Sequence, residues 1–393
     1  MNLIQSSFLL SIAASALSLG ACSGSAPAGN NNLYYDANPV ISNLADNVIV
    51  ASYQELNTEA ALLKTAITAL NGSDDLSSGA LISAQNAWKA TRGPWERSEG
   101  FLIGPVDSLG IDPKLDSWPL NTVDLATAVN SGFSSNASED VQGFHTIEYL
   151  LFGDGILSNT RSTELSPNEL TYLQDLLTNF TSHTQTLVDA WTIQYNPSDV
   201  NSGPYVNELK LTGDGLYLSQ LAVMEELING MIGIVDEVGN GKIADPFAAD
   251  INSADTTLVE SQYSWNSLTD FHNNIQSVLN VYSGKKSYNP AVDSISDSLN
   301  GLYAFVQAHD SQLADRVLNE IIDAMQKIAL IDGDADVTST DISNPLTQIP
   351  FRDAINDPAG RVRISTAINA LGVLQSSLQN EVISLLSVTD FNN

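Results

Sequence analysis

The chain has little cysteine, little histidine and little positive charge. Its 393 residues include one cysteine, four histidines and 15 lysines and arginines, against 46 aspartates and glutamates. A single cysteine excludes a disulfide within the chain. The formal net charge of -31 predicts a surface that repels nucleic acid, and it argues against simple electrostatic attachment to anionic lipid. We therefore expect no nucleic-acid partner.

Long hydrophobic runs are also scarce, and the clearest apolar segment lies at the N-terminus. The run from Leu3 to Leu19 is short and rich in serine, which argues against a membrane-spanning helix. It leads into Leu19-Gly20-Ala21-Cys22, where small residues precede the cysteine as in a lipoprotein signal, although no lysine or arginine comes before the run. We predict a lipoprotein signal peptide over residues 1–21, lipidation of Cys22 and a flexible tether over residues 22–38. From these features we expect a lipid-anchored protein of the cell envelope.

Apolar residues recur at spacings of three and four along much of the chain, whereas strand-like alternation is scarce. This pattern predicts an all-α protein. A polar segment with proline and glycine, Asn196 to Pro204, marks a seam between an N-terminal helical bundle over residues 39–200 and a C-terminal one over residues 201–393. A short similarity between residues 144–153 and 278–284 favours a pseudo-repeat. The apolar stripes are Leu56, Ala60, Leu63, Ile67 and Leu70; Leu313, Val317, Ile321, Met325 and Ile328; and Ile364, Ala367, Leu371, Leu374, Leu378 and Val382.

One histidine lies beside a carboxylate in an apolar run. In Gly143 to Gly153, His145 and Glu148 are three residues apart, so a helix points both side chains the same way. A semi-buried pair of this kind needs a partner or a function. This segment alone leaves two interpretations open. The two side chains either form a structural hydrogen bond or make up half of a functional site.

A second polar group precedes it, in Trp88 to Phe101. Glu96 and Glu99 form another pair three residues apart, and Gly93-Pro94 should kink the helix or begin a fresh turn. Helical bundles build metal sites from such pairs on facing helices, and carboxylates with one imidazole suit iron, manganese or zinc. The alternative is a surface ion-pair ladder with Arg92 and Arg97.

Asp116 adds a third acidic piece. It lies in a loop able to fold back over the bundle, with the role of a turn or cap residue as the alternative. Common catalytic motifs are missing from the sequence: there is no His-Glu-x-x-His, no Gly-x-Ser-x-Gly, no Walker loop and no dinucleotide fingerprint.

Gly143-x-His145-x-x-Glu148 and the Tyr-Leu-Leu-Phe-Gly that follows resemble the signature of imelysin-like proteins, which are exported bacterial proteins. Further blocks similar to the family occur at residues 92–104, 112–119, 230–243, 259–264 and 270–275. The resemblance implies two α-helical bundles with a site at their junction, and a link to iron uptake. It also implies a set of metal ligands, which are Glu96, Glu99, Asp116, His145 and Glu148. The residues that it implies for the lining of the cleft are Arg92, Ser261, Ser264, Asp270 and Asn274.

The sequence therefore leads to the hypothesis of a lipid-anchored protein that binds a metal ion, with iron favoured and zinc as the alternative. The protein either captures iron or passes it to partner proteins of iron uptake. Two rival functions stay open. The family is nominally one of metallopeptidases, so one rival is a zinc-dependent endopeptidase, although the chain shows no recognisable oxyanion stabiliser. The other is a module for a non-metal ligand, in which the His145 and Glu148 network is purely structural.

Overall fold

A computed structural model describes residues 32–213, 215–295, 300–333 and 349–392. The predicted signal peptide, Cys22 and the tether up to residue 31 lie outside these residues. Leu33–Tyr35, within the segment predicted as tether, forms strand β1 and pairs in parallel with β2, Thr389–Phe391. None of the described helices is long and apolar enough to cross a membrane.

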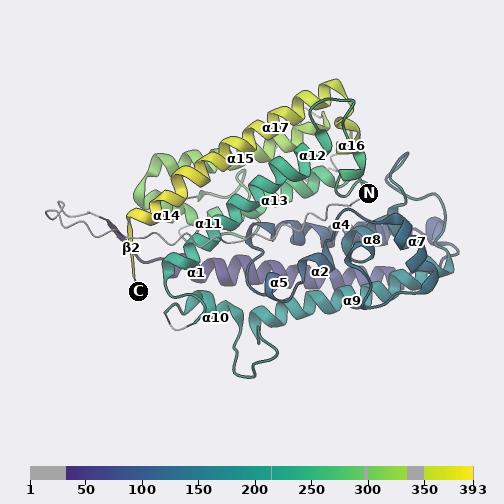
Figure 1. The fold of residues 1–393 in the computed structure, drawn as a ribbon, viewed down its shortest axis with the longest axis horizontal. Coiled ribbons are helices and arrows are strands. Elements are labelled where there is room, and N and C mark those ends of the chain that lie inside the picture. Colours follow the sequence, from purple (N-terminus) through teal and green to yellow (C-terminus); the bar gives the residue numbers. More distant parts are fainter. Residues whose placement is uncertain (1–31, 214, 296–299, 334–348, 393) are drawn as a thin grey trace, which may run out of the picture. The chain divides into compact units, whose positions relative to one another are not determined.

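The described residues are mostly helical, as the apolar spacing predicts. The described residues from Leu33 onward form one compact unit (Figure 1). Before the predicted seam the main elements are α1 (Asn38–Asn43), η1 (Leu44–Val50), α2 (Ala51–Thr68), α3 (Asp75–Ser78), α4 (Ala80–Glu96), η2 (Glu99–Phe101), α5 (Pro105–Ser108), α6 (Asp112–Leu115), α7 (Thr122–Ser131), η3 (Glu139–Val141), α8 (Gly143–Phe152) and α9 (Pro167–Thr192).

The elements after the seam are again mainly helices. They are α10 (Tyr205–Lys210), α11 (Gln220–Asp236), η4 (Glu237–Ile243), α12 (Ala244–Phe247), η5 (Thr256–Leu258), α13 (Ser267–Ser283), α14 (Leu302–His309), α15 (Ser311–Ala329), η7 (Leu330–Asp332), α16 (Phe351–Ala354), α17 (Pro358–Ser377), η8 (Leu378–Val382) and η9 (Ile383–Val388).

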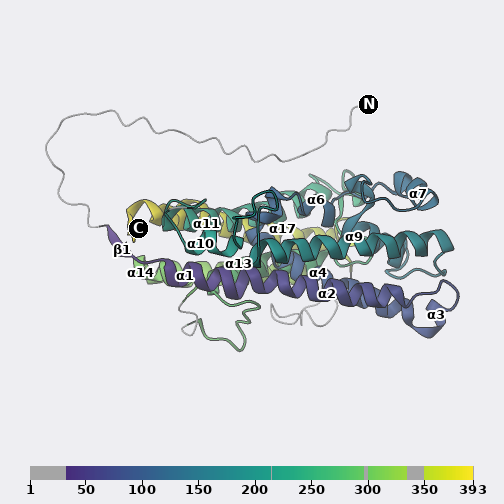
Figure 2. The ribbon, with the colours of Figure 1, turned by 90° about the horizontal axis from the view of Figure 1, so that it is seen from below.

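Two sets of helices pack within this unit. Helix α2 packs on α4 and α9, and α8 packs on both α4 and α9; α2 runs alongside α9 in Figure 2. In the second set α15 packs on α13 and α17, and α11 packs on α13 and α17. Helix α13 joins the sets because it also contacts α4 and η2. The pseudo-repeat relating the two sets remains a prediction.

The apolar stripes predicted from the sequence are buried. All five members of the α15 stripe, Leu313 to Ile328, are core residues, as are those in α2 and α17. Burying a side chain of this size contributes about 1.5–3 kcal/mol, so the stripes explain why these segments dock as helices. Three π-helical turns, η1, η4 and η8, were not predicted, because a single extra residue per turn hardly disturbs the three-and-four rhythm.

Of the two outcomes predicted at Gly93-Pro94, a fresh turn is wrong and a kink stays a prediction. Helix α4 continues through Pro94 to Glu96, and η2 then begins at Glu99. Glu96 and Glu99 therefore belong to two different elements rather than to one regular helix. Their side chains still lie close together, because η2 follows α4 after only two residues.

Candidate metal centre

The His145 and Glu148 pair lies on α8, as predicted, and both side chains are fully buried. His145 Nδ1 lies 3.0 Å from Glu148 Oε2, so the imidazole and the carboxylate face one another across one helical turn. Gly143 opens this helix with φ +78°, and a Cβ there would lie 2.4 Å from the backbone oxygen of Leu115. Only glycine allows this approach, which brings the start of α8 against the loop that carries Asp116.

Glu148 is held from the other half of the chain. Its Oε1 accepts hydrogen bonds from the backbone N–H of Tyr263 at 3.0 Å, from the N–H of Ser264 at 2.8 Å and from Ser264 Oγ at 2.7 Å. The turn that supplies these donors is unusual, because Ser261 and Trp265 both have positive φ, 50° and 59°. Non-glycine residues in this region are strained, and such strain concentrates at functional sites. The turn therefore fixes Glu148, which in turn orients the His145 ring.

Asp116 connects the imidazole to the cationic side of the site. Its Oδ1 lies 3.1 Å from His145 Nε2 and pairs with Arg92 Nη1, while its Oδ2 accepts a hydrogen bond of 2.6 Å from Trp95 Nε1. Trp118, two residues further on, lies edge-on to the His145 ring with 4.5 Å between the ring centroids. Asp116 thus contacts Arg92, Trp95 and His145 through its side chain, and its role as a metal ligand stays a prediction.

Arg92 is completely buried and lies among four carboxylates. The alternative of a surface ion-pair ladder is therefore wrong for Arg92, since the side chain is buried and three of its four partners, Asp116, Glu260 and Asp270, lie outside α4. Its ion pairs are Nη2 to Glu96 Oε1 at 2.5 Å, Nη2 to Glu260 Oε1 at 2.7 Å, Nε to Asp270 Oδ2 at 3.4 Å, and Nη1 to Asp116. Arg97, by contrast, pairs with Glu55 at 3.1 Å away from this network.

Lys242 supplies a second cation. It lies on the π-helical turn η4, its side chain is 9% exposed, and its Nζ is 3.1 Å from Glu260 Oε2 and 3.3 Å from Glu99 Oε2. Neither Lys242 nor Glu260 was predicted as a site residue. Both are within segments that carry the family resemblance, but no local spacing links them to the histidine motif.

The electrostatic environment favours ionised groups around the imidazole. Burial lowers the pKa of His145, but contacts with Asp116, Glu148 and Glu260 outweigh burial and raise that pKa well above its usual value. Burial raises the pKa of Asp116, but Arg92 and His145 more than offset this and hold it well below its usual value. Against the same effect of burial, Lys242, His145 and Arg92 lower the pKa of Glu260 to about 2. Asp116 and Glu260 are therefore anionic at neutral pH.

The glutamate pair of α4 and η2 behaves differently. Burial raises the pKa of Glu96 to about 8, although Arg92 and Lys242 act in the opposite direction. Burial likewise raises the pKa of Glu99 well above its usual value, against the effect of Lys242. This pair therefore takes up protons more readily than Asp116 or Glu260 does.

Among the described residues, two groups of side chains could hold a metal ion. The first comprises Asp116, His145 and Glu260, and the second comprises Glu96, Glu99 and Asp116; in each group one ligand atom per residue lies within 4.8 Å of the others. Asp116 belongs to both. The five predicted ligands thus lie in one buried network, but Glu148 lies behind His145 and is in neither group.

The residues predicted to line the cleft are in the same network. Asp270 pairs with Arg92, and Ser264 donates to Glu148 as described above. Asn274 Nδ2 donates to Glu96 Oε2 at 2.5 Å, and Asn274 is fully buried on α13. Ser261 is also buried and belongs to the strained turn. Residues from both sides of the sequence seam therefore build the site.

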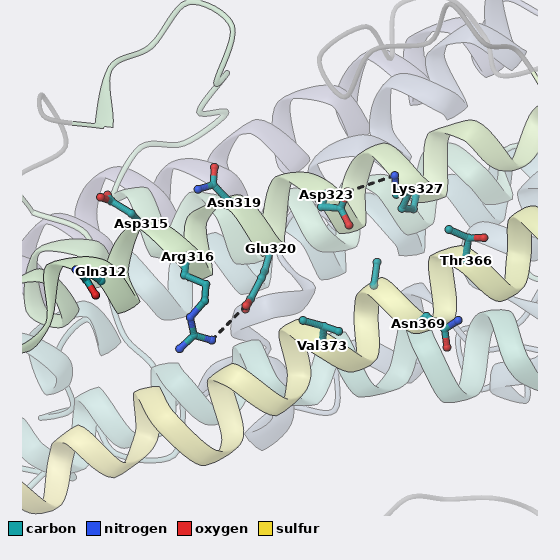
Figure 3. A pocket seen from close by; sticks show the side chains of 11 residues that line it. Gln312, Asp315, Arg316, Asn319, Glu320, Asp323, Lys327, Thr366, Asn369 and Val373 are labelled. Carbon is teal, nitrogen blue, oxygen red and sulfur yellow. Dashed lines mark hydrogen bonds and ion pairs between the residues drawn. The ribbon is translucent and has the colours of Figure 1, made fainter.

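A groove between α15 and α17 has a volume of about 800 Å³ and lies on other residues (Figure 3). Its charged side chains pair with one another rather than converge: Arg316 with Glu320 at 3.3 Å, and Lys327 with Asp323 at 3.4 Å. Neither pair includes a residue of the buried network. The groove offers no comparable set of ligands.

The combination of an imidazole, several buried carboxylates and an all-helical frame matches a known class of protein. A family model described as Imelysin matches residues 49–378, and the chain belongs to the imelysin family. This confirms the resemblance carried by the Gly143 to Gly153 motif.

Individual relatives agree with this family. Over 385 residues the chain is 26% identical to Iron-regulated protein A of Synechococcus elongatus, covering 96% of each protein. A crystal structure from Parabacteroides distasonis, described as that of an iron-regulated protein A precursor, has a TM-score of 0.74 and 30% identity, and the match covers 92% of this chain and 98% of that one. An imelysin-like protein from Psychrobacter arcticum shares the fold, with a TM-score of 0.59, 12% identity and coverage of 91% and 98%.

Proposed function

We propose that this protein binds a metal ion through Asp116, His145 and Glu260 and serves in iron uptake, with iron as its cargo. The observation that carries the proposal is the convergence of these three side chains, whose ligand atoms lie within 4.8 Å of one another, with His145 and Glu260 buried and Asp116 half-buried. An imidazole and two carboxylates form a donor set suited to iron, manganese or zinc.

The polar atoms of the three side chains support the fit of a cation. His145 Nε2 and Glu260 Oε2 are buried and make no hydrogen bond among the described residues; Nε2 lies 3.1 Å from Asp116 Oδ1, and Oε2 lies 3.1 Å from Lys242 Nζ. A metal ion could replace these ion contacts, because a neutral imidazole nitrogen and a carboxylate oxygen are both metal ligands. Glu148 then acts on the ion indirectly, because it holds Nδ1 of His145 and leaves Nε2 for the metal.

The wider role rests on two further points. One relative is named Iron-regulated protein A, a name that concerns the regulation of that protein by iron, and we extend the connection with iron to this chain. The second is the lipobox at Cys22, from which we propose a lipid anchor in the cell envelope. Such an anchor would hold the metal site where exported iron-uptake partners work.

Isothermal titration calorimetry with Fe²⁺ under anaerobic conditions tests the metal proposal. Wild type is compared with an Asp116→Asn/His145→Ala variant and with His183→Ala, which removes a histidine that contacts Asn179 outside the site. We expect binding by wild type and His183→Ala and a loss of at least 100-fold in affinity in the double variant. Equal affinity in all three proteins, or no binding by wild type, would refute the ligand assignment.

The peptidase hypothesis is tested in the same material. Metal-loaded wild type is incubated with an unfolded protein substrate, with and without a chelator. If a chelator stops the cleavage, and the Asp116→Asn/His145→Ala variant does not cleave, the function is peptide hydrolysis rather than the binding of iron as cargo. We expect no cleavage, because the buried side chains of His145 and Glu260 leave no open access for an unfolded protein substrate.

A further inference from the structure

Exposed apolar side chains gather at the end of the folded unit where its first strand lies. Between α10 and α11, three side chains that we call the exposed leucines, Leu211, Leu216 and Leu218, are 67%, 58% and 75% exposed. Tyr34 of β1 is also largely exposed. Single apolar side chains on a surface are ordinary, but several large ones at one place indicate an interaction site.

The fold itself turns these leucines outward. Tyr217, which lies between Leu216 and Leu218, is buried, and its hydroxyl group contacts Tyr205 Oη at 3.0 Å and donates to Glu226. Because Tyr217 is fixed on the inner side, the leucines before and after it face solvent. Their exposure is therefore a consequence of the hydrogen bonds that hold Tyr217.

Hydrogen bonds also place this segment beside β1. Gln220, the first residue of α11, is buried, its Oε1 accepts from the backbone N–H of Ala37 at 2.7 Å, and its Nε2 donates to Asp36 Oδ1 at 3.2 Å. Asp36 directly follows β1, and α10 packs on α1. In Figures 1 and 2 the strands and α10 lie toward one end of this unit, and α7 lies at the other. The exposed leucines thus lie near the start of the folded unit.

The length of chain before β1 limits the distance between this end and a lipid anchor. Cys22, which we propose above as the lipidated residue, is separated from Leu33 by ten residues, 23–32. A fully extended chain of ten residues spans at most about 36 Å. An anchor on Cys22 would therefore keep the exposed leucines close to the membrane. So short a connection raises their effective concentration at the surface, so that weak apolar contacts suffice.

We propose that the exposed leucines insert into the lipid surface and thereby orient the folded unit on the membrane. This inference rests on the lipid anchor of the proposed function and is independent of the metal. Residues 215–224 carry no charged side chain, so the contact depends on apolar area. Since the net charge of -31 opposes approach to anionic headgroups, the surface that fits is one of zwitterionic lipid.

Hydrogen–deuterium exchange on vesicles tests this inference. Residues 22–393, which contain the whole folded unit, are coupled through Cys22 to a maleimide lipid in phosphatidylcholine vesicles. Cys22 is the only cysteine, so the anchor is at one position and is present whether or not a cell lipidates this residue. Backbone amides of residues 215–221 should exchange about tenfold more slowly on vesicles than in solution, equivalent to about 1.4 kcal/mol of docking free energy. Amides of α7 should not change.

Two double variants identify the side chains responsible. Leu216→Ser/Leu218→Ser should abolish the slower exchange. The matched control Val123→Ser/Val362→Ser changes side chains on α7 and α17 that are 75% and 68% exposed, and it should keep the slower exchange. Because all four side chains are exposed, we expect both variants to fold. Adding phosphatidylglycerol to the vesicles should weaken the protection through repulsion of like charges.

The outcomes distinguish this inference from the proposed anchor. Equal exchange on vesicles and in solution overturns the inference, as does equal protection in Leu216→Ser/Leu218→Ser. Protection that appears in solution at high protein concentration and is lost in that variant also overturns it, because the leucines then contact a second copy of the chain. Mass spectrometry of protein purified from membranes tests the anchor separately. An unmodified Cys22 refutes the anchor, while slower exchange on the vesicles still supports insertion of the leucines.

Discussion

Replacing Arg92 by methionine should destabilise the protein strongly. The change keeps much of the apolar stem and removes the guanidinium from ion pairs with Glu96, Asp116, Glu260 and Asp270 in a site with no exposure. Breaking a buried ion pair by removing one partner costs about 3–5 kcal/mol, because the partner charge is left uncompensated. The four pairs share one cation, so the total stays near this range rather than four times it.

This free energy converts into a temperature shift. An unfolding entropy of about 2.1 cal/mol/K per residue over about 360 folded residues gives about 0.76 kcal/mol/K. A loss of about 3–5 kcal/mol then lowers Tm by about 4–7 °C. Differential scanning calorimetry at pH 7 measures it, with Arg316→Met as control because Arg316 is 45% exposed and pairs with Glu320 and Glu381. The control should lower Tm by no more than about 1 °C.

The pH dependence gives a second check on the same reasoning. In wild type the lowered pKa of Asp116 contributes stability that is present above the ordinary aspartate pKa of 3.8 and is lost as the pH falls below it. Arg92→Met removes much of that contribution. The difference in Tm between Arg92→Met and wild type should therefore be largest at pH 7 and smaller at pH 3. A Tm for Arg92→Met within 1 °C of Arg316→Met at pH 7 would refute the buried network as described.

Four further predictions follow from the site. Because the pKa of His145 is raised well above its usual value, Fe²⁺ must displace a proton, so affinity measured by calorimetry should rise about tenfold per pH unit between pH 6 and 7; a constant affinity would contradict this. Gly143→Ala should cost more than about 1 kcal/mol in urea unfolding, because a Cβ there meets backbone at 2.4 Å, whereas Gly372→Ala, with open space, should cost nothing. Metal binding should change the fluorescence of Trp118, whose ring lies 4.5 Å from that of His145, and Trp118→Phe should lose this change while still binding metal; an unchanged signal in Trp118→Phe would show that another tryptophan responds. Cys22→Ser should move the protein from the membrane fraction to the soluble fraction of the envelope, and unchanged membrane association would argue against lipidation.

Local patterns predict the helices and part of the site. The stripe of α15 and the His145 motif of α8 each depend on spacing within one segment, and both are where the sequence predicts them. The Glu96 and Glu99 pair shows the limit of such patterns, since α4 ends between the two residues although they remain close in space.

The remaining site residues come from distant segments. Glu260 lies 115 residues beyond His145 in sequence, and it reaches the site only because the turn before α13 docks on Glu148. Lys242 depends on a π-helical turn, which no apolar spacing reveals. Tertiary packing, not periodicity, brings these charges together.

The pairing of β1 with β2 has a mechanical consequence. Tyr35 and Phe391 are partners in this parallel ladder, and the N–H of Asn392 donates to the oxygen of Tyr35, so the first and last elements of the folded unit are tied at one point. A pull on an attached N-terminus would load this short ladder before any helix. Strand β2 thus holds β1 in place under tension. Deleting Thr389–Phe391 would remove this pairing, and the force would then act directly on α1.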